Sequence, residues 1–291
     1  MSYPRISIVI PCYNHAPFIV EALESVLNQT FNDFECIIID DGSTDNTKEI
    51  VLSWIKTDKR FKYFYQENQG LSNARNRGIT LSSGFYILPL DSDDKISDNY
   101  LEKCFEILEM QANVKIVYGE AYFFGKSNRK WNLDRYNFED ILYKNMIYCT
   151  GLFRKGDWEK VGGYDENLKE GLEDWEFWIH ILKNGGEAVQ INNCYFYYRL
   201  KDISMITESV LKNHYGYNSR LYIFEKHIEL YRKTNFYDMY FENYKLKKAI
   251  NNPLTYLSIN DLFFLLLKAI YLKEVNLMNR IIRKIFNKKL I

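Results

Sequence analysis

The stretch Ile37-Ile-Ile-Asp-Asp-Gly-Ser-Thr-Asp45 carries the pattern that decides the fold. A continuous apolar run of this kind suits a strand that is covered on both faces, as the strands of parallel sheets are. Carboxylates follow the run, and after them come glycine and hydroxyl residues of the kind that open a helix. The stretch therefore predicts a buried strand whose carboxyl end carries polar groups.

Strand-like and helix-like patterns alternate through the first 125 residues. The strand candidates are 6–10, 35–40, 61–65, 85–90 and 115–124, and apolar residues at helical spacing lie within 19–27, 50–55 and 101–108. This alternation predicts an α/β fold with a mostly parallel, doubly wound sheet flanked by helices. In such sheets ligands bind beyond the carboxyl ends of the strands, so chemistry is expected after Ile10, Ile39 and Leu90.

Composition excludes several classes of protein. Thirty-eight Lys and Arg residues balance 38 Asp and Glu residues among 291, which disfavours a strongly basic nucleic-acid binder and a disordered polyanion. The five cysteines are far apart and form no C-x-x-C pair, so reduced thiols are expected in place of a disulfide framework or a zinc site. With no signal-peptide pattern at the N-terminus, a cytoplasmic location is expected.

The sharpest local feature is Leu88-Pro-Leu-Asp-Ser-Asp-Asp94, in which three carboxylates follow an apolar strand. If the backbone stays extended, Asp91 and Asp93 point the same way and can converge on one divalent cation. Mg²⁺ or Mn²⁺ bound there would bridge the carboxylates to a substrate diphosphate. The alternative is a solvated, Asp-rich turn that caps the following helix.

Two further strand ends carry polar groups. In Ile39-Asp-Asp-Gly42 a carboxylate at the strand end can accept N–H or hydroxyl groups from a base or a ribose, and Gly42 allows close backbone approach. The alternative is that Ser43 or Thr44 simply caps a helix. In Ile10-Pro-Cys-Tyr-Asn14, Tyr13 could stack on a base or could merely pack.

Together these strand ends resemble the family 2 glycosyltransferases of the GT-A fold, over about residues 4 to 200. The matching segments are Ser7-Ile-Val-Ile-Pro-Cys-Tyr-Asn14, Ser25-Val-Leu-Asn-Gln-Thr-Phe31, Ile39-Asp-Asp-Gly-Ser-Thr-Asp45, Gly70-Leu-Ser-Asn-Ala-Arg-Asn76 and Leu90-Asp-Ser-Asp-Asp94. The resemblance implies a Rossmann-like sheet and an inverting transfer from a nucleotide-sugar, with a UDP-sugar as donor.

The resemblance also implies roles for individual residues. Nucleotide-binding roles fall on Pro11, Tyr13, Asp41, Arg75, Asp91 and Ser92. Asp41 would accept the uracil N3–H, Arg75 would lie near the diphosphate, and Asp91 would lie near the ribose and the metal. Asp93 would be the principal ligand of Mn²⁺ or Mg²⁺. Many relatives have a histidine that can join the metal where this chain has Lys201, which could instead neutralise the diphosphate.

A catalytic base is expected in Gly171-Leu-Glu-Asp-Trp-Glu-Phe-Trp178, which matches the Glu-Asp-Trp signature of the family. An acceptor hydroxyl is a poor nucleophile, so a carboxylate must take its proton, and we assign this role to Asp174. Glu173 would raise the pKa of Asp174 or orient it, and Trp175 and Trp178 would stack on sugars. The alternative is that the acids favour the helix dipole and both tryptophans lie in the core.

The predicted function is an inverting, metal-dependent transfer of a sugar from a UDP-sugar to a hydroxyl of a glycan or lipid-linked acceptor, in bacterial surface polysaccharide synthesis. Two alternatives stay open. Leu90-Asp-Ser-Asp93 also fits a phosphohydrolase with an aspartyl nucleophile, although Lys95 stands where that class has Thr or Val. A non-catalytic module that binds nucleotide-sugars or glycans is the other.

The predicted catalytic domain is 1–204, with a nucleotide-sugar half at 1–125 and an acceptor half at 126–204. Residues 205–291 are predicted to be a helical, basic and aromatic C-terminal region. Over 280–288 the apolar residues fall on one stripe of a predicted helix and basic residues lie beside that stripe, as in a helix that lies on an anionic membrane. Peripheral contact with the inner face of the plasma membrane, homodimerisation and docking on the catalytic domain are equally compatible with this pattern.

Overall fold

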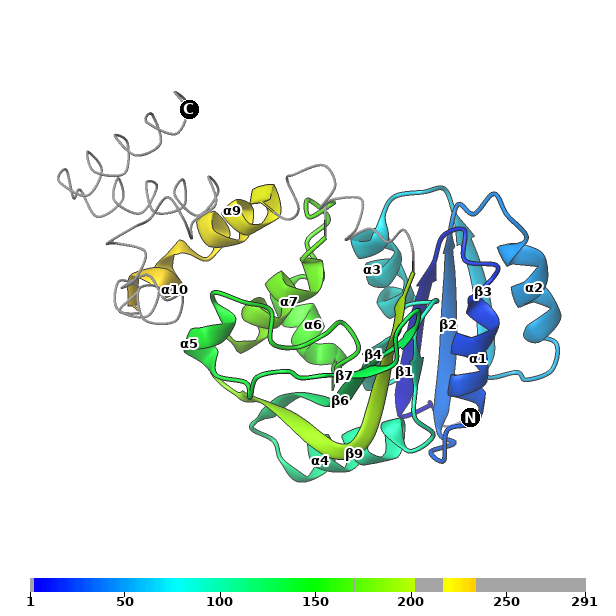
Figure 1. The fold of residues 1–291 in the computed structure, drawn as a ribbon, viewed down its shortest axis with the longest axis horizontal. Coiled ribbons are helices and arrows are strands. Elements are labelled where there is room, and N and C mark those ends of the chain that lie inside the picture. The colour runs from blue at the N-terminus through cyan, green and yellow to red at the C-terminus, as the bar shows by residue number, and fades with distance from the viewer. Residues whose placement is uncertain (1–2, 170, 202–216, 234–291) are drawn as a thin grey trace. The chain divides into compact units, whose positions relative to one another are not determined.

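The computed structural model describes residues 3–169, 171–201 and 217–233 (Figure 1). The chain divides into two compact units, 1–223 and 224–291, and the sheet and the candidate site belong to the first. In the second unit the rings of Phe224 and Tyr231 pack with their centroids 4.8 Å apart. Most of the predicted C-terminal region, 205–291, lies outside the described residues, and so does its amphipathic stretch over 280–288.

In the described part of the chain, nine strands form one sheet in the order β3-β2-β1-β4-β8-β6-β9-β5, and β7 pairs with β6. The strands are β1 (Ile6–Cys12), β2 (Phe34–Asp41), β3 (Phe61–Gln66), β4 (Tyr86–Pro89), β5 (Lys95–Ile96), β6 (Val114–Gly125), β7 (Arg129–Trp131), β8 (Leu152–Arg154) and β9 (Glu187–Leu200). The first four strands in this order pair in parallel. The predicted α/β fold is therefore confirmed, with the expected parallel pairing in this half of the sheet. Among the described residues, each antiparallel pair involves β8, β5 or β7.

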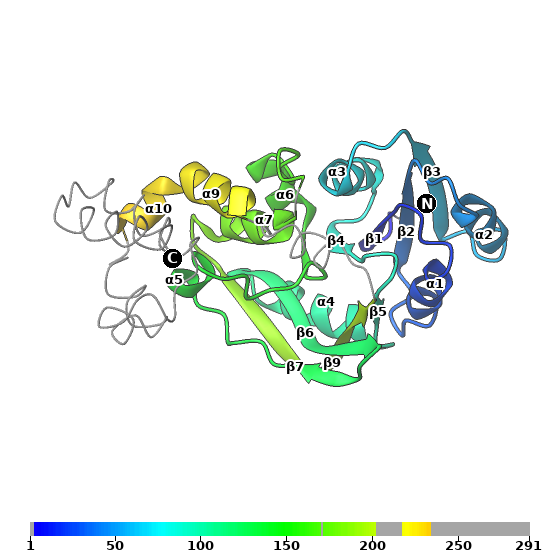
Figure 2. The same cartoon turned by 45° about the horizontal axis from the view of Figure 1, so that its top comes forward.

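Helices cover both faces of the parallel half of the sheet. The helices are α1 (Ile19–Leu27), α2 (Thr47–Trp54), α3 (Leu71–Leu81), α4 (Tyr100–Met110), α5 (Phe138–Ile141), α6 (Lys155–Val161), α7 (Glu173–Leu182), α9 (Tyr217–Lys226) and α10 (Ile228–Lys233). Figure 2 shows α3 on one side of β1 and β2, with α1 and α2 on the other. This is the doubly wound arrangement expected from the alternation of strands and helices.

The core lies around β1 and β2, in which every residue is buried. The apolar run at Ile37 to Ile39 is thus covered on both faces, as its composition predicts. Helix α3 approaches closely because Gly78 has no side chain: a Cβ there would lie 2.4 Å from Cγ1 of Val9. All five cysteines are free and buried, as expected for reduced thiols.

The long strand β9 is not among the strand candidates of the sequence, because the pattern from 132 to 198 is less regular than the alternation before it. It runs parallel to β6, but the pairing slips between Val114 and Ile116 and again between Tyr118 and Glu120. Asn193 has a positive φ of 55°, which breaks the regular alternation of sides that a strand signal requires. Among the described residues, none of the helices combines the length and apolar character needed to cross a bilayer.

Candidate active site

The loops that follow β1 and β2 are joined by the side chain of Asn14. Its Oδ1 accepts hydrogen bonds from the backbone N–H groups of Thr44 at 2.8 Å and Asp45 at 3.3 Å. In return, the backbone N–H of Asn14 donates to Oγ of Ser43 at 3.0 Å. Ser43 therefore connects the two strand ends, and α2 begins only at Thr47. Tyr13, beside this junction, is 48% exposed, whereas Pro11 is buried within β1.

Asp41, at the end of β2, holds the loop that leads into α3. Its Oδ1 accepts from Nε2 of Gln66 at 2.6 Å and from the backbone N–H of Gln69 at 2.8 Å. Its Oδ2 accepts from the backbone N–H of Gly70 at 2.8 Å. Gly70 has φ 92° and ψ 165°, a conformation that only glycine adopts readily. One buried carboxylate thus fixes the shape of the entire loop.

The segment after β4 is a turn, so the prediction of extended backbone at Asp91 and Asp93 is wrong. The strand ends at Pro89, and the backbone N–H of Asp94 donates to the carbonyl of Asp91 at 3.0 Å. A hydrogen bond between residues i and i+3 closes a turn, in which alternate side chains no longer share a face. The turn leads into β5, and not directly into a helix.

Arg75, on α3, joins the segment after β4 to the first turn of α7. Its Nη2 lies 2.7 Å from Oδ1 of Asp91, and its Nη1 lies 2.6 Å from Oε1 of Glu173. The Arg75 side chain is only 1% exposed, so its pair with Glu173 is buried and its pair with Asp91, which is 25% exposed, is partly buried. Burial opposes ionisation of Asp91, but the guanidinium outweighs it and holds the pKa of that carboxyl below its ordinary value.

Asp93 and Ser92 contact a lysine and a histidine that come from other strand ends. Oδ2 of Asp93 lies 2.6 Å from Nζ of Lys201, and Nε2 of His15 lies 3.1 Å from the same Nζ. Nδ1 of His15 lies 2.6 Å from Oγ of Ser92. Burial lowers the pKa of His15, with the Lys201 charge acting in the same direction against that of Asp93. Sequence reasoning missed His15, although it directly follows the Pro11 to Asn14 motif.

Asp94 and Cys149 complete this end of the site. Oδ1 of Asp94 accepts from the backbone N–H of Arg199 at 2.8 Å, while the thiol of Cys149 donates to Oδ2 of Asp91 at 3.4 Å. Burial, and then the charges of Asp93 and Asp91, raise the pKa of Asp94 well above its ordinary value. Burial likewise raises the pKa of the Cys149 thiol. Cys149 carries no recognisable motif, so the sequence held no signal for it.

Three of the residues at this end could together offer ligands to a divalent cation. Within the described residues, ligand atoms of Asp91, Asp94 and Cys149 lie within 4.8 Å of one another, and Asp93 is not part of that group. A thiol such as that of Cys149 is a poor ligand for Mg²⁺ or Mn²⁺, which prefer oxygen donors. Asp91 and Asp93, the two predicted ligands, are each paired with a protein cation instead. This donor set does not fit the metal that the sequence predicts.

Asp174 lies in the first turn of α7, next to Glu173. Nδ2 of Asn145 donates to its Oδ2 at 3.0 Å. Burial, and then the charge of Glu173, raise the pKa of the Asp174 carboxyl to about 7. Trp175 and Trp178 are buried, so the predicted stacking of these rings on sugars is wrong and their alternative place in the core is confirmed.

A pocket of about 370 Å³ lies between the N-terminal end of α3 and the loop before α7. Its lining combines residues of both segments: Asn68, Gln69, Gly70, Leu71, Ser72, Glu166, Leu168, Lys169, Gly171 and Glu173. The loop that Asp41 holds therefore forms one wall, and Glu173 stands on the other. The nucleotide-side and acceptor-side segments predicted from sequence meet at this hollow.

The chain is similar in sequence to known glycosyltransferases. The chain is 30% identical over 210 residues to a putative teichuronic acid biosynthesis glycosyltransferase, TuaG, of Bacillus subtilis, covering 69% of this chain and 81% of that protein. It is 30% identical over 186 residues to chondroitin synthase of Escherichia coli, covering 62% of this chain and 27% of that one. The chain spans less than two thirds of the length of several such relatives.

Among solved structures, the TarS fragment 1–349 of S. aureus in complex with UDP-GlcNAc superposes with a TM-score of 0.61 at 20% identity, covering 70% of this chain and 60% of that one. The same fragment in complex with UDP gives a TM-score of 0.59 at 21% identity, covering 68% and 61%. At these identities the likeness shows the fold, which is GT-A. The family model described as glycosyl transferase family 2 matches residues 7–167. On this match, and on the relation to TuaG, the chain belongs to the family 2 glycosyltransferases.

Proposed function

We propose that this chain is an inverting glycosyltransferase that moves a sugar from a UDP-sugar to a hydroxyl group of a glycan or lipid-linked acceptor. The observation that carries the proposal is the fork of Arg75, which holds Asp91 with one nitrogen and Glu173 with the other. It brings the donor-side turn after β4 to the helix that bears the proposed base. An enzyme that joins two substrates needs these two parts side by side.

The proposed base is Asp174. A carboxyl group with a pKa near 7 is matched to accepting a proton at neutral pH, because it is basic enough to bind the proton yet largely available. Glu173, held by Arg75, places a negative charge beside it, and Asn145 orients one of its oxygens. As the acceptor oxygen attacks the anomeric carbon, Asp174 takes its proton and UDP leaves from the opposite face. The single displacement inverts the anomeric configuration.

The assignment of UDP rests on the fold relatives and on the predicted nucleotide residues. TarS structures hold UDP or UDP-GlcNAc. In this chain Tyr13 offers an exposed ring for stacking on a base. Asp41 uses both oxygens on its loop, yet each carboxylate oxygen accepts up to two hydrogen bonds, which leaves capacity for the uracil N3–H. Pro11 and Ser92 are proposed to contact the nucleotide as well.

Arg75 is proposed here as a positioning residue. The predicted contact between Arg75 and the diphosphate would require displacement of at least one of its two carboxylate partners. The metal dependence expected from Asp91 and Asp93 stays a prediction of the sequence. Because the donor set does not fit the ion, no step of the proposed reaction uses one.

The proposed pathway is bacterial surface polysaccharide synthesis, because TuaG carries the name of teichuronic acid biosynthesis. A lipid-linked acceptor would place the enzyme at the inner face of the plasma membrane. The amphipathic stretch over 280–288, which would make this contact, lies outside the described residues.

The test is incubation of the purified chain with a panel of UDP-sugars and glycan or lipid-linked acceptors. We expect release of UDP and a product whose mass rises by one sugar residue. Release of inorganic phosphate would support the aspartyl phosphohydrolase. UDP-sugar binding without release of either would support the non-catalytic module. Both results would overturn the proposal.

A further inference from the structure

We infer that Lys201 is the resident cation of this site: its ammonium group neutralises Asp93 and binds the donor diphosphate, so that nucleotide binding requires no divalent metal. This inference rests on the proposed function, because it assumes that a nucleoside diphosphate enters here. It assigns to one side chain of the chain itself the charge that a metal ion would otherwise supply.

The Lys201 ammonium contacts a carboxylate oxygen and an imidazole nitrogen, two groups that also bind metal cations. Its Nζ lies 2.6 Å from Oδ2 of Asp93 and 3.1 Å from Nε2 of His15. Because an ammonium group only donates, Nε2 of His15 must accept, and Nδ1–H of the ring then donates to Oγ of Ser92. Lys201 is 20% exposed and Asp93 is 15% exposed, so the pair is partly shielded from solvent.

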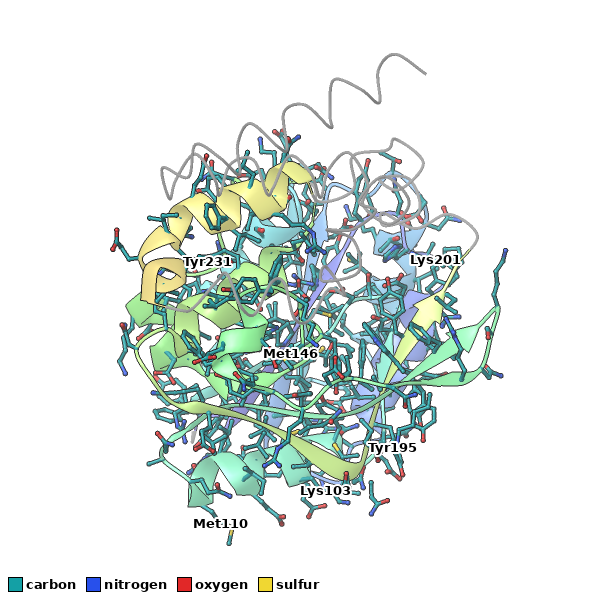
Figure 3. The ribbon with its side chains drawn as sticks, turned by 60° about the vertical axis from the view of Figure 1, so that its left-hand side comes forward. Lys103, Met110, Met146, Tyr195, Lys201 and Tyr231 are labelled. Atoms are coloured by element: carbon teal, nitrogen blue, oxygen red, sulfur yellow. The ribbon has the colours of Figure 1, made fainter. Side chains whose placement is uncertain are left out.

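The backbone that carries Lys201 is fixed by the strand pairing. Strand β5 pairs antiparallel with β9, with Lys95 opposite Tyr197. The residues after Tyr197 therefore return alongside the residues before Lys95. Lys201 directly follows the end of β9 (Figure 3), and its Nζ contacts Asp93 in the turn after β4. The pairing makes the ammonium a built part of the site, although the two segments are far apart in the sequence.

Arg199, two residues before Lys201, binds the end of β9 to the turn after β4 and to α1. Its Nε donates to the carbonyl of Asp93 at 2.8 Å, its backbone N–H donates to Asp94, and its Nη2 lies 2.7 Å from Oε1 of Glu21 on α1. Both Arg199 and Lys201 also lie over the ring of Phe18, at 5.0 Å and 5.2 Å from its centroid. The end of β9 is thus fixed by several contacts of Arg199, and these contacts position Lys201 beside Asp93.

The two carboxylates that were predicted to bind the metal are already paired with protein cations, which disfavours binding of a metal ion. Arg75 neutralises Asp91 and Lys201 neutralises Asp93. A divalent ion on Asp93 would lie next to the ammonium, and like charges at that range repel strongly in a partly buried site. An ammonium group has three N–H donors, and in the described part of the chain two have partners. The third can serve a phosphate oxygen, which lysine binds as a point charge.

The experiment measures the affinity of the full chain for UDP by calorimetry, once in EDTA and once with Mn²⁺ or Mg²⁺. We expect the wild-type dissociation constant to change by less than about twofold between these conditions. Lys201→Met should weaken UDP binding by more than about tenfold in EDTA, and Mn²⁺ should restore part of it because Asp93 is then unpaired. Lys201→Arg, which keeps the charge, should stay closer to wild type. Circular dichroism checks that each variant is folded.

A histidine at this position gives the sharper arm, since neutral imidazole is a metal ligand and carries no charge of its own. In Lys201→His we expect UDP binding to become dependent on Mn²⁺, with a gain of more than about tenfold over EDTA. Lys95→Met is the matched control, because Lys95 pairs with Glu21 and not with Asp93, and its UDP affinity should not change.

Three results would overturn the inference. Wild-type binding that EDTA abolishes and Mn²⁺ restores would show that the metal is needed. Wild-type affinity for UDP in Lys201→Met in EDTA would show that the ammonium contributes nothing. Absence of UDP binding under every condition would overturn the proposed function together with the inference, whereas the first two results leave the proposed function standing.

Discussion

Nη1 of Arg75 lies 2.6 Å from Oε1 of Glu173, although 98 residues separate the two along the chain. The pair is buried, and the other terminal nitrogen of the same guanidinium holds Asp91. Arginine suits this place because its planar fork serves two carboxylates at fixed angles, which the single ammonium of lysine cannot do. The relation between the turn after β4 and the first turn of α7 is therefore set by one side chain of α3.

Substitution of Arg75 should lower the free energy of unfolding of the chain. In Arg75→Met, Asp91 and Glu173 lose a buried partner, and the free energy of unfolding should fall by about 3–5 kcal/mol. Arg75→Lys should recover only part of this loss. Chemical denaturation measures it, with Arg77→Met on the same helix as the control, because Arg77 contacts the carbonyl of Tyr65 near the surface. Equal losses in the two methionine variants would contradict a special role for Arg75.

Substitution of Asp174 should separate chemistry from binding. Asp174→Asn keeps the shape of the side chain but cannot take up the acceptor proton, so turnover should fall by about 10²-fold or more while UDP affinity changes little. Measured UDP release and calorimetry give the two quantities. Loss of the folded state in this variant would instead support the alternative in which the carboxylate only favours the helix dipole.

The pH dependence of turnover should report the same group. Asp174 acts only when unprotonated, so kcat/KM should rise with pH and level off above an apparent pKa of about 7. The folded chain binds this proton more tightly than the unfolded chain, so the contribution of Asp174 to stability falls as pH rises toward 7. A rate profile for the wild type that is flat from pH 5 to 8 would count against this base.

The sequence predicted the strand ends well because parallel strands bring their carboxyl ends to one edge. Asp41, Asp91 and Asp174 each follow from an apolar run, a turn signal or a motif within a few residues. Lys201 and His15 meet across 186 positions, and their meeting depends on β9. That strand is bulged and contains Asn193 at positive φ, so no regular alternation marks it in the sequence. Pairing between distant segments was the part that local patterns could not give.

Close packing of α3 on the sheet gives a prediction about stability alone. In Gly78→Ala the added Cβ would lie 2.4 Å from Cγ1 of Val9 and 3.1 Å from Cγ1 of Ile39, so the core must shift. We expect a loss of about 1–3 kcal/mol in the free energy of unfolding. Gly156→Ala on α6 is the matched control, since a Cβ there meets nothing within 4 Å. Thermal denaturation of both variants makes the comparison, and similar melting temperatures would refute the close approach.

Asp41 offers the last test, because it holds the loop before α3 and is proposed to bind the uracil. All three of its described partners donate to it, so an amide in Asp41→Asn would turn an NH₂ group toward at least one N–H donor. The loop and Gly70 should then lose their fixed shape, and UDP affinity should fall by about tenfold, in line with a lost hydrogen bond to a charged group. Asp40→Asn is the control, because it removes the same charge at the same strand end. The Asp40 carboxylate accepts from the backbone N–H of Ser43 and the hydroxyl of Tyr63, and not from the loop before α3. If both variants weaken UDP binding equally, the effect comes from charge and not from the loop. If Asp41→Asn binds UDP as the wild type does, Asp41 has no part in the nucleotide site.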